Sequence, residues 1–140
     1  MKNNRVFRIV APHPAVEGAL AEGRHDWVPL SFLAGMVEED TPRWESGQYH
    51  PSEEEMKAET IAVCGFLLRE GLMRVGELSN STEDSDNFLP WTGDITERIS
   101  RDWDFLMSRE HFEPCWLEIT ERGRSEAEKI PPLPPEEREP

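Results

Sequence analysis

Cysteine is scarce in this sequence of 140 residues, and the two that occur, Cys64 and Cys115, lie inside apolar segments rather than in a Cys-x-x-Cys pattern. The N-terminal stretch MKNNRVFRIV lacks the long apolar run of a secretory signal, and no segment resembles a membrane span. Without a secretion signal, free buried thiols are a better interpretation than a disulfide. We therefore expect a cytoplasmic protein that does not bind membranes.

The sequence also contains few cations: it has 15 Lys and Arg but 29 Asp and Glu, which gives a formal net charge of −14. Affinity for duplex nucleic acid comes largely from cations that neutralise phosphates. Three cations, Lys2, Arg5 and Arg8, precede the first acidic residue of the chain. They could form a phosphate-binding arm, or they could lie on the solvated edge of a strand. The overall charge predicts a basic protein as partner and argues against nucleic acid.

Apolar residues make up only 36% of the chain, although five Trp and six Phe compensate because each aromatic side chain buries a large area. A chain of this length can bury a modest core without disulfides or metals. We expect a single domain over residues 1–130. The Pro-rich, charged end, PPLPPEEREP, predicts a disordered tail over residues 131–140.

Signals for a metal or cofactor are missing. No two histidines have the i, i+3 or i, i+4 spacing of a helical metal site, and the glycines are isolated rather than grouped into a phosphate-binding loop. A zinc site assembled from distant loops stays open as an alternative. The four histidines are His13, His25, His50 and His111. We predict that the protein binds no metal and no cofactor.

Catalytic signals are equally weak. Cys64 lies in the middle of a predicted helix on its apolar stripe, which favours a packed thiol over a nucleophile. Glu118 alternates with apolar residues on a predicted strand, so it is either an acid–base candidate or part of the solvent face of that strand. We predict that the protein is not an enzyme.

The clearest element is a helix over residues 52–70. Ser52 and Glu55 have the spacing of a capping box, and the apolar residues Ile61, Cys64 and Leu68 form one stripe. Gly71 is placed to end the helix in a left-handed conformation. Residues 15–25 lack strong periodicity, so no element is predicted there. Strands are predicted near residues 5–10, at 72–78 and at 115–119. Further helices are predicted from Pro29 or Ser31 to residue 40, at 94–109 and after Thr120.

The segments FLLREGLMRVGEL and CWLEITERGR resemble the second half of a winged-helix domain. In that family a helix ends in an acidic-Gly step, as at Glu70 and Gly71, a strand leaves it, and a second strand returns into a Thr-x-x-Gly-Arg helix start, as at 120–124. The chain also resembles small uncharacterised bacterial proteins built this way. The resemblance implies an α+β, winged-helix-like fold.

Two departures from that pattern affect the expected function. About 36 residues, 79–114, replace the short wing hairpin and include a predicted helix, so we expect an extra helix inserted between the last two strands. The helix over 52–70 takes the DNA-reading position in the family, but here it holds five glutamates against Lys57 and Arg69. The resemblance therefore favours the fold more than DNA binding.

Aromatic residues next to acids provide the candidate binding surface. Exposed aromatics can anchor a partner protein while carboxylates steer it, although the same aromatics could instead cover a small core. We expect residues 79–92 to be exposed around the acids, with Trp91 fixing the far end to the body. The candidate partner-binding residues are Trp44, Tyr49, Glu83, Asp84, Asp86, Phe88 and Trp91.

The leading interpretation is a non-catalytic, acidic protein-binding module of the bacterial cytoplasm, such as an immunity or antitoxin-like protein that masks a basic partner. The alternative is a winged-helix transcriptional regulator whose cations gather on one face and bind DNA. The sequence does not distinguish a monomer from an oligomer.

Overall fold

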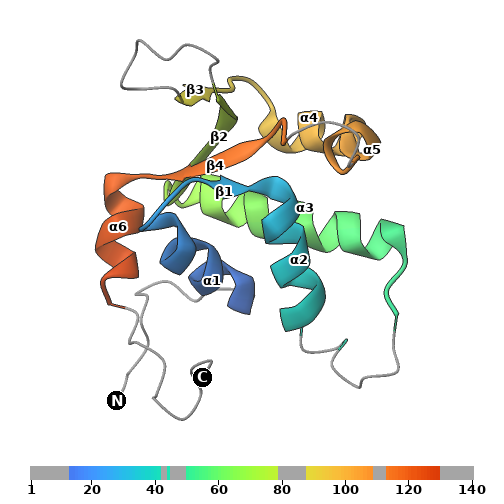
Figure 1. Ribbon diagram of the computed structural model, residues 1–140, viewed down its shortest axis with the longest axis horizontal. Coiled ribbons are helices and arrows are strands. Elements are labelled where there is room, and N and C mark those ends of the chain that lie inside the picture. The colour runs from blue at the N-terminus through green and yellow to red at the C-terminus, as the bar shows by residue number, and fades with distance from the viewer. Residues whose placement is uncertain (1–12, 42–43, 45–49, 79–87, 109–112, 130–140) are drawn as a thin grey trace.

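The computed structural model describes residues 13–41, 44, 50–78, 88–108 and 113–129 (Figure 1). These residues form one four-stranded antiparallel sheet with helices packed around it, which confirms the α+β part of the predicted fold class. The elements in chain order are α1 (Pro14–Gly23), β1 (Val28–Pro29), α2 (Leu30–Asp40), α3 (Glu53–Arg69), β2 (Met73–Leu78), β3 (Phe88–Pro90), α4 (Ile95–Arg101), α5 (Trp103–Leu106), β4 (Trp116–Ile119) and α6 (Glu121–Ala127).

The strands lie in the order β1-β4-β2-β3. Leu117 of β4 is opposite Val28 of β1 and Val75 of β2, and all three side chains are buried, so they form an apolar line across the sheet. The neighbouring register pair, Arg74 and Glu118, carries opposite charges. Alternation of apolar and polar side chains along the strands therefore defines the inner face of the sheet.

The helix α3 is the longest element and confirms the predicted helix over 52–70. The Glu55 amide donates to Ser52 Oγ at 3.1 Å, and the Ser52 amide donates to Glu55 Oε1 at 2.8 Å, which completes the capping box. At the other end, Gly71 has φ +70°, a backbone conformation that other residues rarely adopt. In Figure 1, α1 lies below α3, α2 crosses α3 in this view, and α4 and α5 lie above it; both α2 and α4 contact α3.

The Thr-x-x-Gly segment attaches α6 to the end of α3. Thr120 Oγ1 accepts from the Gly123 amide at 2.9 Å and donates to the Gly71 carbonyl at 2.6 Å. A Cβ atom on Gly123 would lie 2.1 Å from the Leu72 carbonyl oxygen, so only glycine permits this approach. The motif therefore caps α6 and fixes its distance from the chain that leaves α3.

The predictions differ from the structure in the N-terminal third. Residues 14–23 form the helix α1 although they lack strong periodicity, and its buried side chains are mostly small: Ala15, Val16, Ala19, Leu20 and Gly23. β1 is only two residues long and was not predicted. The helix predicted from Pro29 or Ser31 to residue 40 is confirmed as α2. The strand predicted near 5–10 and the tail predicted over 131–140 lie outside the described residues.

The segment between β2 and β4 has the predicted length but contains more elements than predicted. The helix predicted over 94–109 is present in part but divides at Asp102 into α4 and α5, and a third element, β3, adds an edge strand to the sheet. β3 lies close to β2 because position 76 is glycine: a Cβ atom there would lie 2.2 Å from the Leu89 carbonyl oxygen. We call residues 88–108 the insert, and the remaining described elements the body.

Candidate functional site

The predicted partner-binding aromatics are less exposed than expected. Trp44 is 6% exposed and packs in the core, and Phe88 is 3% exposed, with the Arg74 guanidinium 5.1 Å from its ring centroid. Neither ring can anchor a partner without unpacking. The alternative, that these aromatics cover the small core, applies to Trp44, which belongs to the core cluster, and Phe88 is buried as well.

Trp91 is half-buried and is held on two sides. Its indole N–H donates to Glu77 Oε1 at 3.2 Å, and the Arg98 guanidinium lies 3.6 Å from its ring centroid. The ring also packs against the core cluster. These contacts tie the start of the insert to β2 and α4. The other four candidates, Tyr49, Glu83, Asp84 and Asp86, lie outside the described residues.

The two cysteines are free and buried, as predicted. Burial away from water disfavours the charged thiolate and raises the pKa of Cys64 to about 12. The pKa of Cys115 is also raised, first by burial and then by its electrostatic interaction with Cys64 and Glu113. Since the thiolate is the nucleophilic form, neither cysteine is prepared for catalysis near neutral pH.

Glu118, the carboxylate considered as an acid–base candidate, is occupied by structural contacts. Arg74 Nε donates to Glu118 Oε1 at 3.0 Å, and the Trp27 indole N–H donates to Glu118 Oε2 at 3.2 Å. The two contacts join Glu118 of β4 to Arg74 of β2 and to Trp27, the residue before β1, which is 91 positions away in sequence. The side chain is 24% exposed and serves to align β1, β4 and β2.

His13 has a structural role that the sequence did not reveal. Its Nδ1 accepts the Ala15 amide at 2.9 Å at the start of α1, so the ring proton belongs on Nε2, which lies 2.7 Å from Thr41 Oγ1. Thr41 Oγ1 in turn donates to the Val37 carbonyl at 2.6 Å. The buried imidazole therefore joins the start of α1 to the end of α2.

Metal ligation has no candidate within the described part of the chain: no group of three or more His, Cys, Asp or Glu side chains there is placed to hold an ion. His25 and His50 are exposed and come from different regions, and His111 lies outside the described residues. Among those same described residues, no helix is long and apolar enough to cross a membrane.

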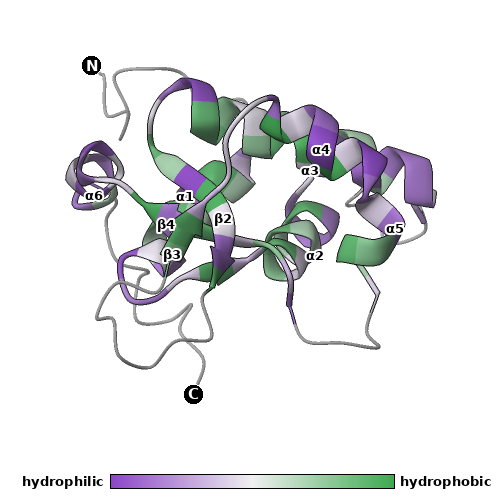
Figure 2. Ribbon diagram, turned by 90° about the horizontal axis from the view of Figure 1, so that it is seen from above, coloured by the Kyte–Doolittle hydropathy of each residue, from purple (hydrophilic) through white to green (hydrophobic). Residues whose placement is uncertain are grey.

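The outer surface of α3 is partly covered by α4 and carries few cations. Seen from above, α4 overlies α3 (Figure 2), and a methyl group on Gly65 would lie 3.5 Å from Thr96 Cγ2 of α4. The side chains of α3 that remain well exposed are two acids, two alanines and a single cation: Glu53, Glu54, Ala58, Ala62 and Arg69.

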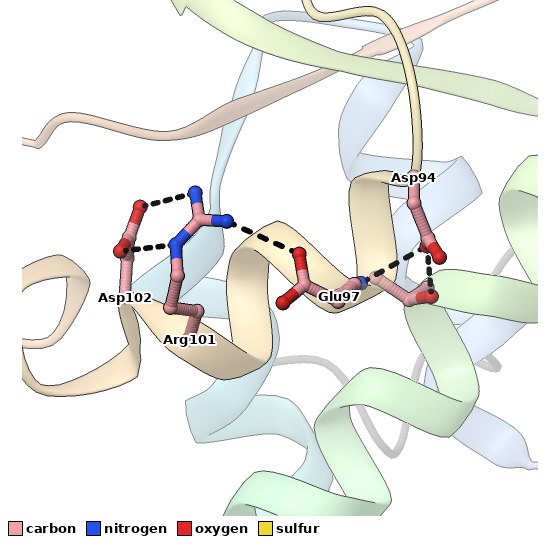
Figure 3. Close-up of polar contacts among 5 residues, drawn as sticks. Asp94, Glu97, Arg101 and Asp102 are labelled. Carbon is pink, nitrogen blue, oxygen red and sulfur yellow. Dashed lines mark hydrogen bonds and ion pairs between the residues drawn. The ribbon is translucent and has the colours of Figure 1, made fainter.

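The surface of α4 is organised by a short row of ionic contacts (Figure 3). Asp94 accepts the Glu97 amide at 3.1 Å and so caps the helix, while Arg101 contacts both Glu97 and Asp102 at 3.2 Å. The hydrogen bond and the charge of Asp102, followed by the charge of Glu97, raise the pKa of Arg101. These exposed contacts shape the point where α4 ends and α5 begins.

One hollow lies between α2, the start of α3 and α5, and we call it the α2–α5 hollow. It has a volume of about 210 Å³. The Trp103 indole N–H donates to Glu53 Oε2 at 2.8 Å at its edge. No cation is found among the described residues that line it, which include Gly35, Glu38, Glu53, Met56, Trp103 and Met107.

A second hollow, of about 300 Å³, lies where α1, β4 and α6 meet, and we call it the α6 hollow. Its polar groups are largely satisfied by one another: Trp27 binds Glu118, and Arg124 donates to the Arg24 carbonyl at 3.3 Å. Because Asp26, Glu118 and Arg124 all line it, the hollow has no single preferred charge. It offers less chemical selectivity than the α2–α5 hollow.

Comparison with family models, curated proteins and solved structures finds no match for the chain.

Proposed function

We propose that the chain is a non-catalytic, acidic protein-binding module on a winged-helix-like fold, and that it masks a basic partner as an immunity protein or antitoxin does. The net charge of −14 supports a basic partner, because opposite charges speed diffusional encounter and exclude partners of like charge. The buried thiols and the occupied Glu118 carboxylate support a binding role rather than catalysis.

The single observation that carries the proposal is the environment of α3. A DNA-reading helix must enter the major groove and offer donors and acceptors to base edges. Here α4 packs alongside α3, and the exposed Ala58 and Ala62 have no hydrogen-bonding side chains. Glu53 and Glu54 at its start would face phosphates with like charge. These features disfavour DNA and suit a protein surface.

The alternative function is a winged-helix transcriptional regulator. The succession of α3, β2 and β4, with β2 antiparallel to β4 and α6 starting at Thr120, supports the family resemblance on which this alternative depends. Against it, the exposed cations Arg74 and Arg122 already pair with Glu118 and Glu70, which lowers their value as phosphate ligands. We therefore place protein binding first.

The proposal is tested by crosslinking the tagged full chain in the cells that produce it, after nuclease treatment to remove bridging DNA. We expect a basic partner protein whose own activity falls in proportion to added chain and is lost at equimolar amounts. Recovery of a defined DNA sequence instead, or a partner whose activity is unaffected by the chain, would contradict the proposal.

A further inference from the structure

The α2–α5 hollow has the size of a site for one side chain. Pockets for drug-sized ligands usually occupy about 300–1,000 Å³, whereas this hollow occupies about 210 Å³. α2 and α5 also carry two of the exposed large apolar side chains, Phe32 and Phe105. In protein interfaces, much of the binding energy comes from a few anchor side chains that fill small pockets near the centre of the contact.

The lining of this hollow is both apolar and acidic. Met56 and Met107 are half-buried and pack against the core, and their thioethers adapt readily to the shape of a guest. Trp103 adds an aromatic ring. Glu38 and Glu53 are exposed and provide carboxylates on two different helices. An apolar wall with acids at its edge matches a side chain that has an aliphatic stem and a positive head.

Charge identifies the occupant more closely. No cation is found among the lining residues that the structure describes, and the whole chain carries an excess of acid. A cationic head can form charge-assisted hydrogen bonds with Glu38 and Glu53 while its methylene groups contact the methionines. We propose that the α2–α5 hollow receives an arginine or lysine side chain of a partner protein, an inference that rests on the proposed function.

The test uses two small probes, Nα-acetyl-arginine amide and the neutral Nα-acetyl-glutamine amide, titrated into the ¹⁵N-labelled full chain. The Trp103 indole N–H is the reporter, because an incoming cation competes for the Glu53 carboxylate that this group binds. The Trp27 indole in the α6 hollow is the internal control. We expect only the arginine probe to shift the Trp103 signal, with a dissociation constant of about 1–10 mM, since one side chain buries little surface.

Two pairs of variants localise the binding. Glu38→Gln removes an acid from the hollow and should weaken the arginine probe about fivefold, the scale of an exposed ion pair. Glu39→Gln makes the same charge change on an exposed neighbour that does not line the hollow, and should change affinity less than about twofold because solvent and salt screen it.

The second pair uses Gly35, which lines the hollow and has open space where a Cβ would be. Gly35→Leu should fill the hollow and abolish the Trp103 shift, whereas Gly35→Ala should leave it. An unchanged Trp103 signal at the highest soluble concentration of the arginine probe, equal shifts at Trp27, or full binding by Gly35→Leu would overturn the inference.

The outcome is separable from that of the proposed function. A Trp103 shift that Gly35→Leu removes supports the side-chain site even if crosslinking recovers no basic partner, and the proposed function then fails alone. Conversely, a basic partner that binds the wild-type chain and Gly35→Leu equally well supports the proposed function and overturns the assignment of its anchor to this hollow.

Discussion

The body and the insert are stabilised in different ways. Among the residues that the structure describes, only Ile99 of the twelve largest fully buried side chains belongs to the insert, while the others come from the body. The described residues include three exposed large apolar side chains, and two of these, Leu89 and Phe105, belong to the insert. The body therefore supplies most of the aliphatic core, and the insert packs against it through Ile99, Trp103 and Leu106. The indoles of Trp91 and Trp103 add hydrogen bonds to Glu77 and Glu53 of the body.

This difference indicates that the body provides most of the stability, whereas the insert shapes the surface that could bind a partner. Elements with few buried apolar contacts open locally at lower free energy than the core. The insert also supplies Trp103 and Met107 to the α2–α5 hollow and α4 to the cover of α3. The insert, which covers part of α3 and lines the α2–α5 hollow, is therefore also the segment with the fewest fully buried apolar side chains.

The largest expected effect compares one buried leucine from each region. Leu117→Ala in β4 removes a fully buried side chain from the centre of the sheet and should lower the free energy of unfolding by about 2–5 kcal/mol. Leu106→Ala in α5 should cost near the lower end of that range, because a site beside a hollow relaxes more easily. Urea denaturation measures both, and a larger loss for Leu106→Ala would break the comparison.

The contact between the two regions is tested next at Gly76. Gly76→Ala places a methyl group against the Leu89 carbonyl and should cost about 1–3 kcal/mol while displacing β3 from β2. The direct readout is hydrogen exchange of the Trp91 amide, which donates to the Val75 carbonyl at 2.8 Å. If the protection of this amide is unchanged in Gly76→Ala, the insert is not fixed at this point.

The buried thiol of Cys64 makes the body sensitive to alkaline pH. The pKa is about 12 in the folded chain and near 9.0 for an ordinary thiol, so between these values the unfolded state has lost a proton that the folded state retains. Stability from this group is complete below pH 9 and falls by about 1.4 kcal/mol per pH unit above it. Denaturation of the wild type and Cys64→Ala from pH 8 to 11 should show a shallower loss in the variant; parallel curves would contradict a buried thiol.

Helix caps give the smallest expected effect. Ser52→Ala should lower the free energy of unfolding by about 1 kcal/mol, because a first-turn amide of α3 loses its acceptor. Asp94→Ala removes the corresponding acceptor from α4. If the insert opens before the body, Asp94→Ala should speed amide exchange in α4 more than it changes the denaturation midpoint. An equal midpoint change for both variants would argue for one cooperative unit.

Local signals were sufficient for several parts of the fold. Ser52, Glu55 and Gly71 act on residues three or four positions away, so the bounds of α3 follow from nearby sequence. Thr120 and Gly123 likewise mark the start of α6. The helix α1 was missed because its cap is His13 rather than Ser, Thr, Asp or Asn, and because its buried face is made of small residues.

The candidate site depended on distant contacts that local patterns do not reveal. Trp44 and Phe88 look like loop aromatics in sequence, yet their burial is decided by the elements that fold against them. The α2–α5 hollow combines Gly35, Glu53 and Trp103 from three separate helices. Only the excess of acid, a property of composition, pointed to its chemistry in advance.

The central claim, that the chain presents an acidic surface for a protein and no DNA-reading helix, is tested most directly by fluorescence anisotropy. A labelled random duplex is titrated with the full chain at low salt, where even nonspecific binding to a basic face would be strong. The account predicts no complex, because the exposed face of α3 offers two acids, two alanines and Arg69. A micromolar complex that weakens steeply as salt is added would contradict it and favour the transcriptional regulator.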